Sequence, residues 1–230
     1  MDISLSDIIK SYDDSGDRRM IFDGMSAVFP SGEFSVIMGK SGVGKSSLLN
    51  LISGIDLPDN GRITIGPHRV SEMNDTQRTI FRRQHIGFVY QSFNLIPVLT
   101  VLENVTLVAE LDGVRPRIAR ENAVLLLGKV GLSDLCSRYP DNLSGGEQQR
   151  VAIVRSLVND PDILLADEPT GNLDQETGGL VLEMLTDLAK NYGKTLIMVT
   201  HSPESIAYAD QVYVVADHTL IARPGKKIGP

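Results

Sequence analysis

Continuously apolar runs alternate along this chain with longer segments whose apolar residues recur at helical spacing. Runs of the first kind occupy residues 33–38, 87–90, 163–166 and 196–199. After the first run, apolar residues recur at helical spacing over residues 48–52, and Gly54 follows them. Short apolar strands that alternate with amphipathic helices are typical of a largely parallel sheet covered on both faces.

A polar residue or a glycine follows each of the apolar runs. The first run ends at Gly39, and Gln91, Asp167 and the pair Thr200 and His201 follow the others. Ligands of such sheets bind beyond the carboxyl ends of the strands. We therefore expect the chemistry of this protein to gather at that edge of the sheet.

Two parts of the chain depart from the parallel pattern. Residues 1–32 and 55–70 contain turn signals between short alternating segments, as in antiparallel hairpins. Residues 92–158 are mainly helical in pattern, with one helix predicted over Ile118 to Val130 and another over Val151 to Val158. The predicted fold is α/β: a mostly parallel central sheet, an antiparallel β subdomain and a helical subdomain, within a single domain over residues 1–230.

Composition and charge narrow the function classes. Of the 230 residues, 42% are hydrophobic and 22% are charged, which is ordinary globular usage, and the net charge of −7 argues against broad nucleic-acid binding. No apolar run is long enough to span a bilayer, and the first residues do not resemble a signal peptide. Cys136 is the only cysteine, so it is expected to be a buried small hydrophobe rather than a nucleophile. We expect a cytosolic protein.

The segment GKSGVGKS matches the phosphate-loop pattern between a predicted strand and a predicted helix. Its residues are Gly39, Lys40, Ser41, Gly42, Val43, Gly44, Lys45 and Ser46. Glycines let backbone N–H groups surround a phosphate, while Lys45 would neutralise phosphate charge and Ser46 would bind Mg²⁺. This segment predicts a nucleoside triphosphate site; a ligand-free glycine turn is the weaker alternative. Lys40 either contacts phosphate or is simply solvated.

Polar residues at the other strand ends are candidates for the chemistry of hydrolysis. Asp167 could hold Mg²⁺ and Glu168 could orient water, although an acidic pair also caps a strand. Gln91 could reach Mg²⁺ or the attacking water, and His201 could donate to the γ-phosphate, although either could be structural. Tyr12 could stack on the nucleobase or could belong to a half-buried strand.

A second glycine-rich stretch reads LSGGEQQR and precedes the predicted helix at Val151. Ser144 and Glu147 have the spacing of a capping box, so the stretch could be only a helix start. Capping does not explain Gly145 and Gly146, which are unfavourable in a helix and suit close approach to an anion. Both interpretations stay open on this pattern alone.

Taken in order, GKSGVGKS, YQ, LSGGEQQR, ILLADEP, NLD and TH resemble the ATP-binding subunit of ABC transporters over nearly the whole chain. The resemblance implies a P-loop NTPase, the ABC ATPase fold, with ATP and Mg²⁺ as cofactors. It also implies a head-to-tail dimer of two copies, in which Asp174 contacts the partner, and a separate membrane permease that Gln91 couples to ATP. The protein would lie at the cytoplasmic face of the cell membrane.

The same resemblance implies roles for individual residues. Catalysis would fall to Glu168, His201, Lys45 and Gln91, and the metal would be bound by Ser46, Gln91 and Asp167. Nucleotide contacts would come from Tyr12, Gly39, Lys40, Ser41, Gly42, Val43, Gly44, Lys45, Ser46, Ser47, Ser144, Gly145, Gly146, Glu147 and Asp174. Ser47 stands where the family usually has threonine.

Within the family, the segments QSFNLIP and DEPTGNLD are most similar to the lipoprotein-release and macrolide-export group. The alternatives are an ABC ATPase that moves no solute, such as a cell-division regulator, and an amino-acid import ATPase. The tail ADHTLIARPGKKIGP departs from the family because it lacks the Asp-Gly turn between its last strands, which leaves that edge of the sheet unassigned.

Overall fold

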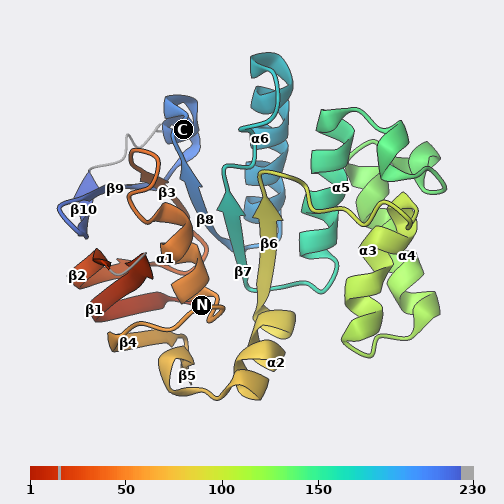
Figure 1. The fold of residues 1–230 in the computed structure, drawn as a ribbon. Helices are drawn as coiled ribbons and strands as arrows, with labels where there is room; N and C mark the ends of the chain where they lie inside the picture. The colour runs from red at the N-terminus through yellow and green to blue at the C-terminus, as the bar shows by residue number, and fades with distance from the viewer. Residues whose placement is uncertain (15–16, 224–230) are drawn as a thin grey trace.

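The computed structural model describes residues 1–14 and 17–223. Two sheets and a group of helices make up the fold (Figure 1). The strands are β1 (Ile3–Asp14), β2 (Asp17–Phe29), β3 (Phe34–Met38), β4 (Asn60–Ile65), β5 (His68–Arg69), β6 (Ile86–Tyr90), β7 (Ile163–Asp167), β8 (Thr195–Thr200), β9 (Gln211–Ala216) and β10 (Thr219–Arg223). The α-helices are α1 (Lys45–Ile52), α2 (Asp75–His85), α3 (Val101–Leu111), α4 (Pro116–Lys129), α5 (Gly145–Leu157) and α6 (Gln175–Asn191), with short 3₁₀ helices at Val70–Glu72, Ser133–Leu135, Pro140–Asn142 and Pro203–Tyr208.

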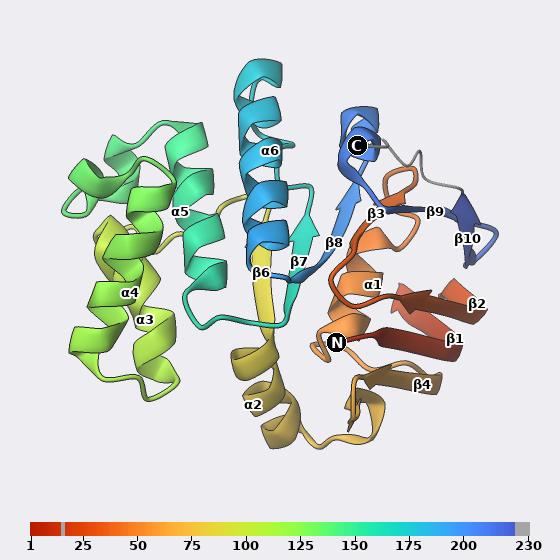
Figure 2. The same cartoon turned by 180° about the vertical axis from the view of Figure 1, so that it is seen from behind.

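The larger sheet has the strand order β10-β9-β3-β8-β7-β6, and every pair in it except β9 with β10 is parallel. Its apolar residues alternate between two cores. Ile37, Leu165 and Ile197 pack with α1, whereas Val36 and Leu164 pack with α5 and α6. Figures 1 and 2 accordingly show α1 and α6 on opposite faces of this sheet. The predicted parallel sheet, covered on both faces, is confirmed.

The smaller sheet is antiparallel, in the order β2-β1-β4-β5, and it comes from residues 1–32 and 55–70 as expected. Its first strands are longer than the turn signals indicated, because β1 and β2 run for 12 and 13 residues and shift register at bulges instead of breaking. Phe22, Phe29 and Ile63 bury this sheet against α1. The helix that begins at the phosphate loop is thus held between two sheets.

Residues 92–158 are helical, as the pattern predicted, and contain α3, α4 and α5. Their core side chains include Val105, Leu127 and Val151, which join the same apolar cluster as α6. Cys136 is partly buried against this cluster, so the expectation of a small hydrophobe holds with less burial than anticipated.

Two features of the fold were not anticipated. Helix α2 has a weak apolar pattern, and Phe81 is its only buried residue. Asn74 and Gln77 form a capping box at its start. The β9–β10 turn uses Asp217 and His218, which both have positive φ angles, in place of a glycine. These residues complete the last hairpin, and residues 224–230 of the tail lie outside the described part of the chain.

Candidate functional site

The phosphate loop connects β3 to α1 and leaves the start of that helix open. Gly42 and Gly44 have φ angles of 78° and 104°, a region that L side chains rarely adopt. A Cβ on Gly44 would also collide with the side chain of Ile21. Gly44 is the N-cap, α1 has no side-chain cap, and its first turn contains no acidic residue. The first N–H groups and the positive end of α1 are therefore available to an anion.

Lys45 is the cation of this loop, and its side chain is only 8% exposed. Its Nζ donates to the carbonyl oxygens of Gly39 at 2.9 Å and Lys40 at 3.2 Å, and it lies 3.7 Å from Oε1 of Glu168. A buried ammonium with such partners is held in place. The Lys40 side chain is exposed, whereas Val43 is half-buried against the apolar core.

Asp167 and Glu168 lie at the carboxyl end of β7, between the ends of β6 and β8. Burial raises the pKa of the Asp167 carboxyl, although the hydrogen bond from Ser46 lowers it in part. Oε2 of Glu168 accepts from the backbone N–H of His201 at 3.2 Å and lies 2.8 Å from Nδ1 of the same residue. The backbone of Glu168 is left-handed, with φ 47°, and its carboxylate lies between Lys45 and His201.

A cavity of about 680 Å³ lies in front of these residues. It is lined by Tyr12, Asp13, Arg19, Ile21, Ser41, Gly42, Gly44, Lys45, Ser46, Ser47, Tyr90, Gln91, Ser92, Asp167 and Glu168. The structure thus brings most of the residues predicted for one nucleotide site to one cavity. The oxygens of Ser46, Asp167 and Gln91 that face it are of the kind that Mg²⁺ prefers.

Gln91 reaches this cavity from the end of β6 but is also tied to the segment after β7. Its Nε2 donates to Oδ1 of Asn172 at 3.2 Å, and Nδ2 of Asn172 donates back to the Gln91 carbonyl at 2.9 Å. Beyond it, Phe93 and Asn94 both have positive φ, and Arg155 donates to their carbonyls at 2.8 and 2.5 Å. The loop after Gln91 is therefore held by α5.

The second glycine stretch lies elsewhere. Among the described residues, none from Ser144 to Glu147 lines the cavity of the phosphate loop. Ser144 and Glu147 form the predicted capping box: the Glu147 N–H donates to the Ser144 hydroxyl, and the Ser144 N–H donates to the Glu147 carboxylate at 2.7 Å. That backbone hydrogen bond lowers the pKa of Glu147.

The packing of α5 within this chain also requires glycine at position 146, which the sequence did not reveal. A Cβ there would lie 2.5 Å from Cγ2 of Thr177, so α5 and α6 approach too closely for a side chain. Packing against α6 is thus a further reason for the second glycine, beside the helix start and the close approach to an anion that the sequence left open.

Asp174 caps α6, where its Oδ1 accepts from the Thr177 N–H at 3.0 Å. It also lines a separate hollow of about 250 Å³ together with Glu168 and His201. The His201 side chain is 71% exposed, so it stands open to whatever lies against this surface.

Sequence reasoning assigned no role to several residues that shape the site: Arg19 and Arg155, which lie outside the motifs, and Asn172, which lies within DEPTGNLD. Arg19 pairs with Tyr12 across β1 and β2, and its guanidinium donates to the Gly42 carbonyl at 2.5 Å. Asn172 and Arg155 act on the Gln91 loop from distant elements. Arg19 could have been identified from its cross-strand pairing with Tyr12. That pairing can be predicted only when the register of the β1–β2 hairpin is already known.

Within the described residues, no helix is long and apolar enough to cross a membrane, and no cluster of three metal-ligating side chains forms from His, Cys, Asp and Glu.

Comparison with known proteins agrees with this geometry. The ABC transporter family model matches residues 22–171. An uncharacterized ABC transporter ATP-binding protein of Mycobacterium tuberculosis is 51% identical over 219 residues, covering 95% of this chain and 88% of that protein. The lipoprotein-releasing system ATP-binding protein LolD of Legionella pneumophila is 41% identical, covering 94% and 95%.

Among solved structures, the ABC transporter cassette MJ0796 has a TM-score of 0.89 at 35% identity, covering 98% of this chain and 100% of that one. One structure of it is a dimer, and another is a dimeric post-hydrolysis state bound to ADP and Pi. The fold, the phosphate loop and these matches agree: the chain belongs to the ABC transporter family, as one of its ATP-binding ATPases.

Proposed function

We propose that this ATPase uses Mg²⁺ and ATP to power a separate membrane permease of the export or lipoprotein-extraction type. The observation that carries the proposal is the shared cavity of Lys45, Ser46, Asp167 and Glu168, which supplies positive charge and carboxylates at one place. The similarity to LolD supports the lipoprotein-release group. A permease partner would place the chain at the cytoplasmic face of the cell membrane.

Each residue of the cavity would have a distinct task. The N–H groups at the start of α1 and Lys45 bind the phosphates, while Tyr12 stacks on the base. Ser46, Asp167 and Gln91 would hold Mg²⁺, which supplies positive charge at the phosphate oxygens. Glu168 orients and deprotonates water, and His201 donates to phosphate. For this, the Glu168 carboxylate leaves Lys45 and His201, its partners in the present structure.

The site is incomplete in one copy of the chain. Ser144, Gly145 and Gly146 lie at the start of α5, outside the cavity of their own phosphate loop. A second copy, arranged head to tail, would bring these residues onto the nucleotide and would bring the surface with Asp174 and His201 against the partner. The dimers of the similar cassette MJ0796 support this arrangement.

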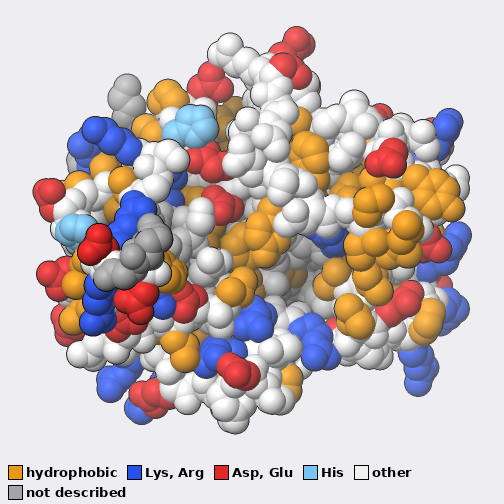
Figure 3. Space-filling model, in the orientation of Figure 1, with side chains coloured by type: hydrophobic (Ala, Val, Ile, Leu, Met, Phe, Trp, Pro, Cys, Tyr) orange, Lys and Arg blue, Asp and Glu red, His pale blue; other side chains and the backbone are white. Residues whose placement is uncertain are grey.

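A groove beside the Gln91 loop is the proposed seat of the permease. It has a volume of about 350 Å³ and is bounded by β6, α3 and α5, with Phe88, Ile96, Leu107 and Val108 among its apolar walls. Figure 3 shows this face of the molecule hollowed between its two halves. Arg155 lies in the groove and holds the loop after Gln91, so a permease segment bound there would act directly on that loop.

The substitution Glu168→Gln tests the hydrolytic site. It removes the carboxylate that activates water but keeps the shape of the side chain, so ATP hydrolysis should fall by about 10²-fold or more. With ATP and Mg²⁺ the variant should accumulate as a dimer on size exclusion. Glu183→Gln, at an exposed position of α6, is the matched control and should behave as wild type.

Undiminished turnover together with a monomeric Glu168→Gln protein would contradict the hydrolytic role and the shared site. Co-purification tests the transport assignment separately. A permease with a large external domain would support export, whereas a permease paired with a soluble binding protein would indicate import.

A further inference from the structure

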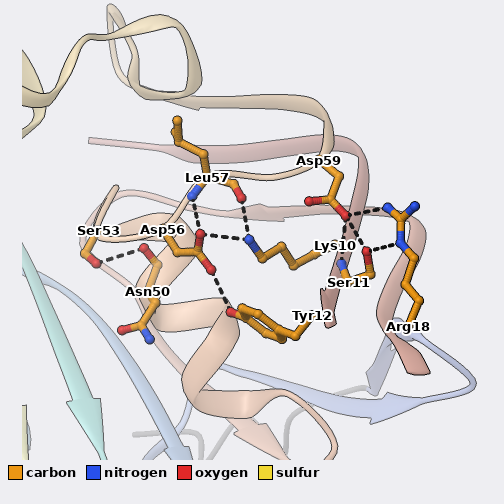
Figure 4. Close-up of polar contacts among 9 residues, drawn as sticks. All are labelled: Lys10, Ser11, Tyr12, Arg18, Asn50, Ser53, Asp56, Leu57 and Asp59. Atoms are coloured by element: carbon orange, nitrogen blue, oxygen red, sulfur yellow. Dashed lines mark hydrogen bonds and ion pairs between the residues drawn. The ribbon is translucent and has the colours of Figure 1, made fainter. Parts of the chain in front are cut away.

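Tyr12 is held by a network that lies outside every recognised motif (Figure 4). Its hydroxyl donates to Oδ2 of Asp56 at 2.6 Å. The other oxygen of that carboxylate, Oδ1, accepts from Lys10 Nζ at 2.7 Å and from the Leu57 N–H at 2.8 Å. Lys10 also donates to the Leu57 carbonyl at 2.9 Å. The polar atoms of this network therefore satisfy one another.

The network leaves one side of the aromatic ring available. Lys10 Nζ lies over the ring, 4.7 Å from its centroid, so a cation covers one face. Tyr12 is nevertheless 37% exposed, and it lines the cavity of the phosphate loop. The hydroxyl of Tyr12 is thus fixed and one face of its ring is covered, while the ring still contacts the cavity.

The network also ties the ring to the helix that begins at the phosphate loop. Asp56 follows α1 closely, and its backbone N–H donates to the carbonyl of Asn50 within that helix at 3.1 Å. Lys45 is the first residue of the same helix. A short, rigid path therefore joins the ring to the phosphate loop at the other end of α1.

The protonation states of Asp56 and Tyr12 favour the hydrogen bond between them. Burial opposes ionisation of Asp56, but hydrogen bonds from Lys10 and Tyr12 outweigh it and hold the pKa of the carboxyl below its usual value. Burial, aided by the bond to Asp56, raises the pKa of the Tyr12 hydroxyl. Tyr12 therefore remains a donor and Asp56 remains an acceptor.

We propose that Asp56 and Lys10 are positioning residues for nucleotide binding, which hold the Tyr12 ring in advance as a stacking platform at a set distance from the phosphate loop. This inference rests on the proposed stacking of Tyr12 on the base. A side chain that is already ordered does not lose rotamer freedom when the nucleotide binds. By ordering Tyr12 in advance, Asp56 and Lys10 therefore remove this entropic cost from binding.

The test compares ATP with inorganic tripolyphosphate, which has the phosphates but no base. Binding is measured by calorimetric titration without divalent cations, so that turnover does not interfere. Tyr12→Phe keeps the ring but loses the hydroxyl, and Asp56→Ala removes its acceptor; each should weaken ATP binding about two- to tenfold. Tripolyphosphate affinity should stay unchanged. Combining the two substitutions should weaken ATP binding no further, because both remove the same bond.

Two variants provide references. Tyr12→Ala removes the platform and should weaken ATP binding more than Tyr12→Phe. Asp59→Asn disturbs the neighbouring contacts of Asp59 with Ser11 and Arg18 but spares the hydroxyl of Tyr12, so ATP affinity should not change.

The outcomes separate the inference from the function on which it rests. If Tyr12→Phe and Asp56→Ala bind ATP as tightly as wild type while Tyr12→Ala binds it more weakly, the positioning role of Asp56 and Lys10 is wrong. Base stacking by Tyr12 would then still stand. Equal losses of ATP and tripolyphosphate binding in Asp56→Ala would also overturn the positioning role, by showing damage to α1. Unchanged ATP affinity in Tyr12→Ala would refute base stacking itself.

Discussion

Asp167 and Glu168 are neighbours in the chain, but their carboxylates lie in different surroundings. Asp167 accepts from Ser46, and burial raises its pKa. Glu168 lies against Lys45 and His201, each a donor or a positive charge. Two adjacent carboxylates can therefore divide the proposed work, with metal binding at Asp167 and water activation at Glu168.

Asp167→Asn should make the nucleotide-free protein more stable at neutral pH. Because burial raises the pKa of Asp167 in the folded state, its ionised form disfavours folding at pH values above that pKa, and this cost disappears as the pH falls and the carboxyl is protonated. The unfolding midpoint of the variant should exceed that of wild type at pH 8, and the difference should shrink toward pH 4.

Thermal unfolding across this pH range measures the effect. Asp187→Asn, at an exposed position of α6, serves as the control. A larger advantage of the variant at low pH than at pH 8 would show that the sign of the Asp167 effect is wrong.

At the scale of elements, the helices differ in how their first N–H groups are satisfied. Helices α2, α3 and α5 begin with capping boxes, and α6 begins with an Asp174 cap. Helix α1 instead begins at Gly44 without a side-chain cap. Helix α4 also lacks a side-chain cap, but it begins with Pro116, which has no N–H group of its own to satisfy. Helix α1 is the uncapped helix whose start faces the large cavity, where a ligand can satisfy its first N–H groups.

The contact of α5 with α6 should make Gly146→Ala destabilising, by about 1 kcal/mol, although alanine is normally the better helix former. The reason is the close approach of Thr177 Cγ2. In a Thr177→Ser background that methyl group is absent, so the same substitution should become neutral or stabilising. Chemical denaturation of the single and double variants measures both effects.

Gly179→Ala is the control for Gly146→Ala, since a Cβ at Gly179 in α6 would meet nothing within 4 Å. It should stabilise the protein by about 0.5–1 kcal/mol. A stabilising Gly146→Ala in the wild-type background would show that α5 and α6 can separate without cost.

At the scale of the whole molecule, the two glycine stretches serve different surfaces. The loop over residues 39–46 opens into the large cavity, whereas Ser144 to Glu147 begin α5 outside it. Under the proposed function, Ser144 to Glu147 can contact nucleotide only from a second copy of the chain, because they lie outside the cavity of their own phosphate loop. The proposed dimer rests on this separation together with the dimers of the similar cassette MJ0796.

Ser144→Arg should leave ATP binding to the monomer within about twofold of wild type, yet abolish dimer formation and hydrolysis, because a long side chain would occupy the space of the partner's nucleotide. Nucleotide titration and size exclusion in the Glu168→Gln background measure the two effects. Loss of ATP binding by the monomer would instead place Ser144 in its own site.

Two further variants isolate the effect of the arginine side chain. Ser144→Ala removes the cap without adding bulk, and should cost about 1 kcal/mol of stability while permitting dimers. Ser137→Arg adds the same charge to the same part of the chain at an exposed position, and should dimerise like wild type.

The sequence by itself determined four strands of the parallel sheet (β3, β6, β7 and β8), helices that pack beside them and the motifs at the strand ends, but not β9. These features follow from patterns that are local in the chain, namely apolar runs, capping residues and the spacing of glycines in the phosphate loop. Helix α2 was missed for the same reason, since Phe81 is its only buried residue and its apolar pattern is too weak. Its local signals were the cap formed by Asn74 and Gln77, the acidic first turn and the basic last turn.

Only the tertiary structure decided which side chains meet. Tyr12 reaches Asp56, Gln91 reaches Asn172, and Arg155 reaches the carbonyls of the loop after Gln91. The conflict of Gly146 with Thr177 likewise arises where two helices touch. Contacts of this kind depend on the packing distance and register of elements far apart in the chain, and the spacing of residues along one element carries no information about either.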